Sequence, residues 1–194
     1  MPFEDCALYM TIPNAVVIDS CDFAQTKSLT KKLAADNHPS YMRLIRKGFT
    51  TVYADGSEFE IGKGVTLKTG TDVTIIASGI LVDEALKAEE QLAKEGISAR
   101  VIDMHTWKPL DEELVLKAAA ETGCIVTAEN HQVSCGLGSA VANVLTEKCL
   151  VPLERIGIQN RFGQVGPQDF LMKEYNLTAE DIAAAAKKAI ARKK

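Results

Sequence analysis

The sequence lacks the features that mark several common classes of protein. It contains no run of roughly 18 apolar residues, and its N-terminal stretch carries Glu4 and Asp5 in place of a long apolar segment, so we expect neither a membrane span nor a signal peptide. A formal net charge of −4 provides no excess of positive charge for a nucleic acid. These absences predict a cytoplasmic protein with no membrane and no nucleic-acid partner.

Paired cysteine motifs are also missing. The five cysteines are Cys6, Cys21, Cys124, Cys135 and Cys149. Their odd number and the absence of any CxxC spacing argue against a disulfide framework and against a zinc site. We therefore expect reduced thiols, most of them small buried residues.

What the chain does contain is the composition of a soluble globular protein. Its 194 residues are 46% hydrophobic and 25% charged, which is enough for one or two domains with a sizeable core. After about residue 60, short β-branched runs alternate with amphipathic helical patterns. Strands are predicted at 73–77, 99–103, 124–128 and 153–158, with helices between them, one of them at 140–150. Two closing helices follow, and Thr178 and Asp181 stand in the positions of a capping box for the last one. This order predicts an α/β fold with a mostly parallel sheet flanked by helices.

The first fifty residues differ from this pattern. They predict a helix, a strand and a second helix, but no earlier strands on which these elements could pack. We therefore expect that the chain begins in mid-domain and that its apolar faces need further protein. The predicted organisation is a partial α/β domain at 1–50, a glycine-rich linker with a β-excursion at 51–70, and a C-terminal domain at 71–194.

Ser78-Gly79 follows the first strand of the repeating unit, with Asp103 at the end of the next strand. That arrangement has a superficial likeness to a dinucleotide site. The sequence lacks GxGxxG, however, and without the second and third glycines the backbone cannot approach a pyrophosphate as such a site requires. A tight turn is the favoured interpretation.

Two loops contain histidines that could take part in chemistry. His131 precedes Cys135, Gly136 and Gly138, where a helix N-terminus could hold an anion, or where the histidine could lower the pKa of the thiol; close helix–strand packing is the simpler interpretation. His105 lies in a predicted polar loop, 103–109, at the carboxyl end of a strand, where ligands bind in open sheets. A packing role beside Trp107 fits it equally well.

Arg43 and Arg46 lie at the end of a predicted strand within residues 39–46. Residues three apart on a strand point to opposite faces, so at most one of them is aimed at a common site unless the strand ends between them. Arg46, nearer the loop, is the better candidate for a bidentate contact to a phosphate or carboxylate. An interdomain salt bridge is the structural alternative.

The whole chain resembles the C-terminal portion of transketolase. Residues 1–50 are similar to the end of that family's pyrimidine-binding domain through Ile12-Pro13-Asn14 and Cys21-Asp22. The remainder is similar to its C-terminal domain. The matching stretches are Glu58–Gly64, Asp72–Gly79, Asp103–Asp111, Glu129-x-His131 and Gly136-Leu137-Gly138, with Cys135 where the family often has a glycine.

This resemblance implies transfer of a two-carbon ketol unit between sugar phosphates, catalysed with thiamine diphosphate and a divalent cation such as Mg²⁺. It places the cofactor and metal sites in protein that is absent from this chain, so we expect no catalytic, cofactor or metal residues here. The implied partners are an N-terminal transketolase portion and a second copy of the chain. Arg46 corresponds to a family arginine that contacts the substrate phosphate, and Arg43 to a structural neighbour.

Related enzymes leave alternatives open. The stretch Lys108-Pro109-Leu110-Asp111 is widespread in the superfamily, which includes deoxyxylulose-phosphate synthase and the β-subunit of 2-oxoacid dehydrogenases. The stretch 53–67 favours transketolase. A further alternative is a non-catalytic dimerisation or interaction module.

Overall fold

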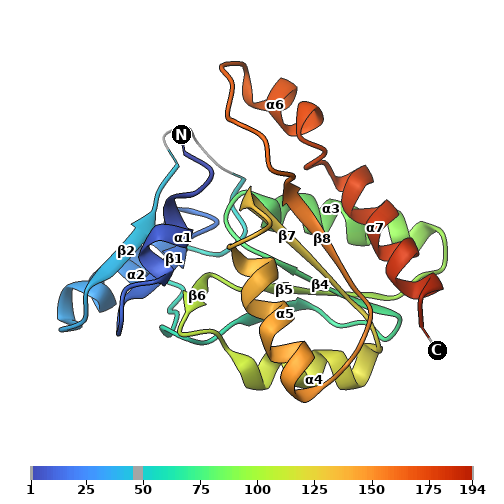
Figure 1. The fold of residues 1–194 in the computed structure, drawn as a ribbon, viewed down its shortest axis with the longest axis horizontal. Coiled ribbons are helices and arrows are strands. Elements are labelled where there is room, and N and C mark those ends of the chain that lie inside the picture. Colours follow the sequence, from blue (N-terminus) through green and yellow to red (C-terminus); the bar gives the residue numbers. More distant parts are fainter. Residues whose placement is uncertain (1, 46–49, 194) are drawn as a thin grey trace.

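The computed structural model describes residues 2–45 and 50–193, which form two sheets with helices around them (Figure 1). The predicted helix, strand and second helix of the N-terminal segment (residues 2–45) are confirmed. They are α1 (Asp5–Met10), β1 (Val16–Asp19) and α2 (Phe23–Ala35), followed by β2 (Ser40–Arg43). The Asp22 side chain accepts a hydrogen bond from the Gln25 backbone N–H and so begins α2.

The large sheet has the strand order β3-β5-β4-β7-β8. Its strands are β3 (Val65–Lys68), β4 (Val73–Ala77), β5 (Ala99–Asp103), β7 (Ile125–Gln132) and β8 (Leu153–Ile158). Every pairing is parallel except that of β3 with β5. The predicted mostly parallel α/β fold is therefore confirmed. The edge strand β3 lies within the predicted linker, 51–70, and joins that stretch to the C-terminal domain (residues 71–193).

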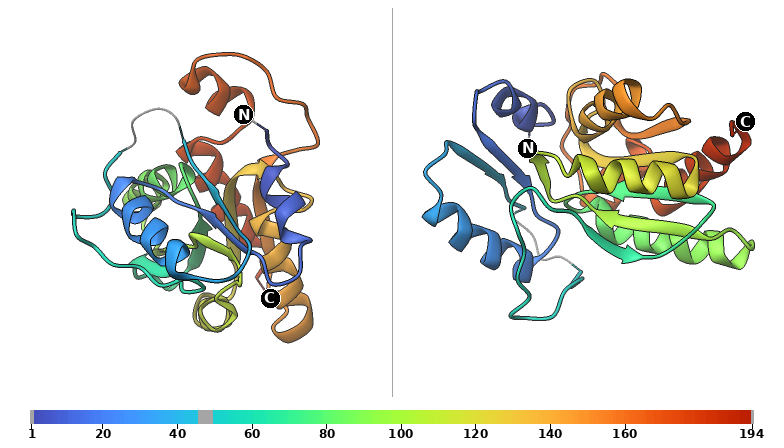
Figure 2. Two further views of the ribbon diagram at one scale, coloured as in Figure 1. Left: turned by 90° about the vertical axis from the view of Figure 1, so that its left-hand side faces the viewer. Right: turned by 90° about the horizontal axis from the view of Figure 1, so that it is seen from below.

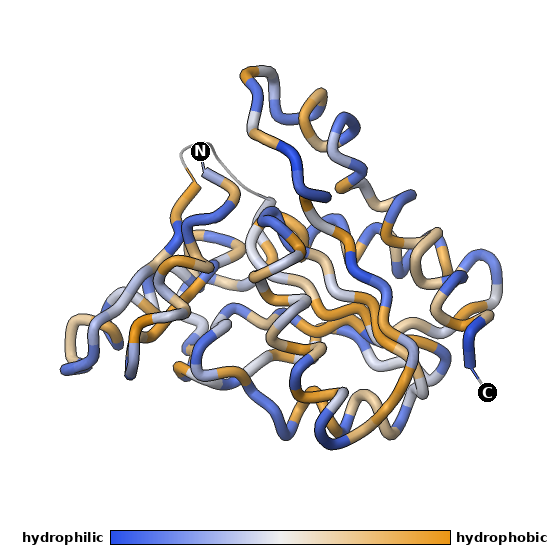
Figure 3. The backbone as a smooth tube through the Cα atoms, in the orientation of Figure 1, coloured by the Kyte–Doolittle hydropathy of each residue, from blue (hydrophilic) through white to orange (hydrophobic). Residues whose placement is uncertain are grey.

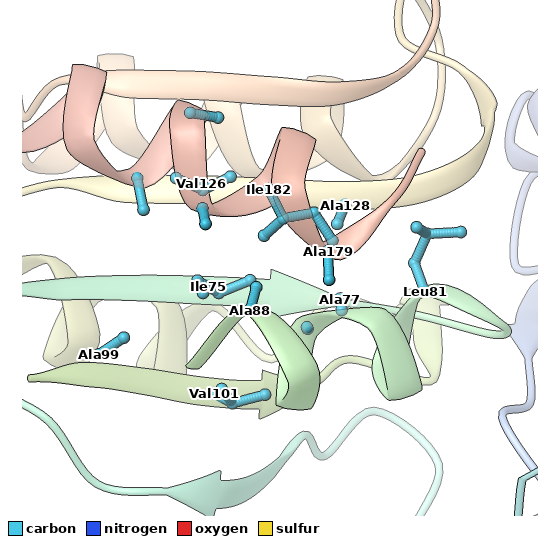
Figure 4. Close-up of a cluster of buried hydrophobic side chains, with 14 of the residues drawn as sticks. Ile75, Ala77, Leu81, Ala88, Ala99, Val101, Val126, Ala128, Ala179 and Ile182 are labelled. Atoms are coloured by element: carbon cyan, nitrogen blue, oxygen red, sulfur yellow. The ribbon is translucent and has the colours of Figure 1, made fainter. Parts of the chain in front are cut away.

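Helices cover both faces of this sheet, as the two views of Figure 2 show. They are α3 (Leu81–Lys94) and α7 (Ala179–Ala191) on one face, and α4 (Glu112–Thr122) and α5 (Leu137–Lys148) on the other. Successive strand residues point to opposite faces, so Ile75 enters the first core and Ile76 the second. Figure 4 shows Ile75 of β4 and Val101 of β5 beside Ala88 of α3, and Val126 of β7 beside Ile182 of α7. Figure 3 shows apolar residues concentrated in these strands.

The smaller sheet has the order β2-β1-β6 and joins the two parts of the chain. Its third strand, β6 (Thr106–Lys108), belongs to the stretch between β5 and α4 and pairs antiparallel with β1. The prediction of a polar loop at 103–109 was therefore wrong. Trp107 is 1% exposed and packs in the second core, so burial of this side chain and pairing with β1 give the stretch its strand conformation.

Two boundaries differ from the predicted ones. Strand β7 continues to Gln132 instead of ending at residue 128, and α5 begins at Leu137 instead of residue 140. The reason is local: the carboxylate of Glu129, on the extended strand, accepts hydrogen bonds from the first turn of α5. The closing helices, α6 (Gln168–Glu174) and α7, are confirmed, as is the capping box formed by Thr178 and Asp181.

A projecting arm, defined here as residues 159–174, leaves the end of β8 and contains α6. Figure 1 shows it standing away from both sheets at the top of the view. All five cysteines are free thiols, as expected. Within residues 2–45 and 50–193, no helix has both the length and the apolar character needed to cross a membrane.

Candidate functional site

The carboxyl ends of β4, β5 and β7 meet the N-terminal segment along a buried polar seam. We use the word seam for the contact made by Asp5, Asp19, Arg43, Asp103 and Glu129 with their partners. All five side chains are almost completely buried. Because buried ionised groups are costly unless they are paired, the contacts of each one decide what the seam can do.

Asp19 connects the end of β1 to the turn after β4. Its backbone N–H donates to the carbonyl of His105 at 2.9 Å, and the Ser78 hydroxyl donates to its carboxylate at 3.0 Å. A Cβ on Gly79 would lie 2.5 Å from this carboxylate, and the φ of +54° at Gly79 also favours glycine. The predicted tight turn at Ser78-Gly79 is confirmed. The Asp19 carboxylate lies against this turn, where a dinucleotide site would hold a phosphate.

Asp103, at the end of β5, is held by three donors from two parts of the chain. The Tyr53 hydroxyl lies 2.7 Å and the Gln25 side-chain amide 2.6 Å from Asp103 Oδ2, and the Cys21 thiol is 3.6 Å away. Burial raises the pKa of Asp103 to about 6 despite these donors. Sequence reasoning missed Tyr53 and Gln25 because no local pattern indicates that two distant side chains converge on one carboxylate.

Arg43 is the buried cation of the seam. Its Nε lies 3.1 Å from Asp5 Oδ2, and its guanidinium donates to the carbonyls of Asn130 and, at 3.0 Å, of Pro2. Neighbouring Asp19 and Asp5 raise the pKa of Arg43 against the opposing effect of burial. The structural role predicted for Arg43 is confirmed, with its ion pair inside the N-terminal segment. Arg46, the candidate substrate contact, lies outside the described residues.

Glu129 occupies the helix N-terminus that the sequence offered as an anion site. Its two carboxylate oxygens accept hydrogen bonds of 2.8 Å from the backbone N–H groups of Leu137 and Gly138. Burial nevertheless raises the pKa of Glu129 to about 8. A Cβ on Gly136 would lie 1.8 Å from this carboxylate, so glycine is required there. The position at the N-terminus of α5 is thus occupied by a side-chain carboxyl group of the protein itself.

His131 is not arranged to activate Cys135. The His131 ring is fully buried, and its Nδ1 lies 3.0 Å from the carbonyl oxygen of Gln132, which identifies Nδ1 as protonated. Its Nε2 accepts a 3.4 Å hydrogen bond from the Ala7 backbone N–H. Cys135 is exposed. Both ring nitrogens are therefore occupied by groups other than the thiol, which favours the packing interpretation of this loop.

His105 likewise has a packing environment. It is fully buried, its Nδ1 lies 2.9 Å from the Thr106 hydroxyl, and its ring meets Phe59 edge-on. Burial lowers the pKa of His105 to about 4, so the ring is neutral at pH 7. Nothing in this geometry sets His105 against a nucleophile or a second base.

The seam therefore combines four acidic side chains with one arginine, and each of them contacts partners within this chain. Within residues 2–45 and 50–193, no three His, Cys, Asp or Glu side chains are grouped as metal ligands. Such an arrangement can fix the N-terminal segment against the C-terminal domain. It does not set a nucleophile beside a base.

Comparison with known proteins identifies the family to which this fold belongs. The family described as transketolase, C-terminal domain, matches residues 62–182. The 6-deoxy-6-sulfo-D-fructose transketolase subunit SqwH of Clostridium sp. (strain MSTE9) is 45% identical over 193 residues, which are 100% of this chain and 60% of that protein. A putative transketolase C-terminal section from Methanocaldococcus jannaschii is 44% identical, over 93% of this chain and 57% of its own length.

A solved structure shares the whole fold. It is described as a split gene transketolase, inactive β4 tetramer, and has 44% sequence identity and a TM-score of 0.95 over 100% of this chain and 63% of that chain. The chain thus spans about 60% of the length of these relatives. The family match and the relatives agree: this chain belongs to the transketolase C-terminal domain family.

Proposed function

We propose that this chain is the C-terminal part of a thiamine-diphosphate-dependent transketolase. In this proposal it acts with an N-terminal transketolase portion to transfer a two-carbon ketol unit from a ketose phosphate to an aldose phosphate. One observation carries the proposal: the fold of the split-gene transketolase chain is matched over the entire chain, with a TM-score of 0.95. The likeness in fold therefore extends over the N-terminal segment as well as the C-terminal domain.

The described residues do not fit thiamine diphosphate and its metal by themselves. They contain no group of metal-ligating side chains, and the carboxylates of the seam face donors within this chain. We therefore assign the cofactor and a divalent cation, Mg²⁺, to the N-terminal portion. The cofactor supplies the carbon–carbon bond chemistry there, while protein groups supply positioning and electrostatics.

The N-terminal segment carries surface suited to that portion. Phe23 is 72% exposed on α2, and Leu8 is 66% exposed on α1. Strand β2 is an edge strand, so one side of its backbone has no strand beside it within the described residues. Apolar side chains around an open sheet edge favour contact with further protein. The seam, on the opposite side of the segment, would hold this surface in place.

Arg46 is the residue we propose for direct substrate contact, as a guanidinium that binds the phosphate of the sugar. In the complete enzyme, Arg46→Ala should weaken phosphorylated donors relative to unphosphorylated ones by about 1.5–3 kcal/mol, the range for a charge-assisted contact. Ratios of kcat/KM for the two donor types measure this difference. Arg192→Ala, at the end of α7, is a matched control. Equal losses for both donors would rule out the phosphate role.

The test of the proposed function begins with the coding sequence upstream of Met1, which should encode the N-terminal portion. The chain and that portion are then purified separately and mixed with thiamine diphosphate, Mg²⁺, a ketose phosphate and an aldose phosphate. Mass spectrometry of the sugars should detect ketol transfer in the mixture and none with either component alone. Transfer by this chain alone would contradict the proposal.

The names of relatives indicate which other activities deserve a parallel assay. SqwH is named for 6-deoxy-6-sulfo-D-fructose, so a sulfonated ketose is the first alternative donor. The 1-deoxy-D-xylulose-5-phosphate synthase 1 of Geobacter sulfurreducens is 36% identical over 97% of this chain and 30% of its own length. Formation of deoxyxylulose phosphate by the mixture would favour that enzyme over a transketolase. A mixture that assembles but transfers nothing would favour an interaction module.

A further inference from the structure

We propose that the projecting arm (residues 159–174) and the apolar groove beside it form a contact surface for a second copy of this chain. This inference deepens the proposed function, on which it rests for the expectation of self-association, by assigning that association to named residues. The solved relative, whose fold this chain shares, is described as a β4 tetramer.

The arm carries apolar side chains that the protein leaves uncovered. Phe162 is 98% exposed, Val165 is 101% exposed and Phe170 is 49% exposed. Isolated exposed apolar residues are ordinary, but these three lie within nine positions on one projection (Figure 1). Their exposure is costly in water unless another surface covers them.

The base of the arm is held in a defined conformation. The Tyr175 hydroxyl donates to the carbonyl of Phe162 at 2.8 Å, and the Gln132 side-chain amide donates to the carbonyl of Arg161 at 2.7 Å. Arg161 pairs with the Glu174 carboxylate and donates to the Glu174 carbonyl at 2.9 Å. Because these contacts hold its base, the arm loses little conformational freedom when it docks, which favours affinity.

A groove of about 380 Å³ lies between the arm and the body of the molecule. The arm contributes Val165 and Leu171 to its lining, and the N-terminal segment contributes Phe3 and Ile45. Tyr175 lies at its base, with Phe3 packed edge-on at a centroid separation of 5.2 Å. One region therefore holds both an apolar projection and an apolar groove.

That juxtaposition suits a two-fold contact between identical chains. In such an interface the same patch is used twice, so the arm of one copy enters the groove of its partner and receives the partner's arm in return. The stretch 162–168, Phe-Gly-Gln-Val-Gly-Pro-Gln, has no charged side chain. Two copies of a chain with a net charge of −4 can therefore meet there without juxtaposing like charges.

The size of the surface is also appropriate. The arm and the remaining groove residues together approach the roughly 20–30 residues per side that a stable interface uses. Aromatic residues near the centre of such a patch contribute most of the binding energy, which identifies Phe162 as the first residue to remove.

The experiment is sedimentation equilibrium of the full chain at several concentrations, with the variant Phe162→Ser/Val165→Ser. These side chains are exposed, so circular dichroism and the unfolding midpoint should match the wild type. We expect the wild type to associate, and the variant's dissociation constant to rise roughly tenfold or more. The control is Leu150→Ser. Leu150 is 84% exposed in the connection between α5 and β8, and its replacement should leave association unchanged.

Three results would overturn the inference: a monomeric wild-type chain, an arm variant that associates normally, or equal weakening by Leu150→Ser. Binding of the N-terminal portion is measured on the same variants. If the arm substitutions abolish that binding and leave self-association intact, the surface belongs to the other subunit and the inference fails. Failure of the proposed function has a separate signature, namely no ketol transfer by the wild-type mixture.

Discussion

The C-terminal domain and the N-terminal segment bury their side chains by different means. In the C-terminal domain, strand residues such as Ile75 and Val126 pack against Leu81 of α3 and Ile182 of α7 in an almost wholly apolar layer. Within residues 2–45 and 50–193, the buried cluster centred on the N-terminal segment contains Val16, Ile18, Leu29 and Phe59, and Phe59 comes from the predicted linker. The seam beside that small cluster contains charged groups.

Apolar burial and buried charged groups stabilise the two regions in different ways. An apolar core is stabilised in proportion to the area it removes from water and tolerates small rearrangements. Buried carboxylates and a buried arginine stabilise a contact only in the correct geometry, and removal of one partner leaves the others unpaired. We conclude that the C-terminal domain is stabilised by its own apolar core. The N-terminal segment contributes Cys6 and Val17 to the second core and depends in addition on exact polar contacts and on β1–β6 pairing.

The largest expected effect comes from breaking the seam at its buried cation. Arg43→Met should lower the free energy of unfolding by about 3–5 kcal/mol, because Asp5 and Asp19 lose their counter-charge. Hydrogen exchange should quicken in β1 and β2 far more than in β4 and β7. The matched control is Lys27→Met, which removes an ion pair with Asp55 at the surface and should leave the free energy of unfolding almost unchanged. Equal effects of both substitutions would refute the distinction between the two regions.

A smaller effect concerns pH. With its pKa raised to about 8 from 4.5, Glu129 retains in the folded protein a proton that the unfolded chain releases, so its contribution to stability falls as pH rises through 8. His105, with its pKa lowered to about 4 from 6.5, has the opposite sign but acts only at or below about pH 6.5. Between pH 6.5 and 8 the free energy of unfolding should therefore fall by roughly 1–2 kcal/mol.

Urea denaturation at several pH values measures this slope, and Glu129→Gln should flatten it. The slope is the readout because the glutamine also loses one of the two carboxylate oxygens that accept from α5. Glu112→Gln, at the exposed start of α4, should retain the wild-type slope. A Glu129→Gln variant with an unchanged slope would show that another group titrates in this range.

The smallest of these effects is expected from a substitution that weakens the C-terminal domain and leaves the N-terminal segment unchanged. Thr178→Ala removes the capping box of α7, which packs on α3, β4, β7 and β8, and should cost about 1 kcal/mol. Exchange in β1 and β2 should be unaffected at temperatures where both regions are folded. Thr146→Ala, exposed within α5, should change stability by less than about 0.5 kcal/mol.

The sequence predicted the parts of this molecule that have local causes. Alternating β-branched runs and amphipathic helices sufficed for the large sheet, and the spacing of Thr178 and Asp181 for the last cap. It did not predict β6, because Thr106-Trp107-Lys108 is too short to show a period and becomes a strand only beside β1. It also did not predict that Glu129 ends up at the start of α5, since that contact depends on the path of the backbone through Gly136.

In the candidate site, too, the sequence predicted features with local causes and did not predict contacts between distant residues. The turn at Ser78-Gly79 followed from residue type and position, whereas the structural role of Arg43 was implied by the family resemblance. The convergence of Gln25 and Tyr53 on Asp103 joins residues 78 and 50 positions apart, which no local pattern can indicate. The role of Arg46 stays a prediction that rests on the family resemblance.

The most direct test of the central claim is a titration of the N-terminal transketolase portion with this chain, with ketol transfer between sugar phosphates as the readout. We predict that the rate rises from zero and reaches a plateau at an equimolar ratio, because each active unit needs one copy of each chain. A rate that is already maximal without this chain, or a mixture that stays inactive at every ratio although the two chains bind, would contradict the account.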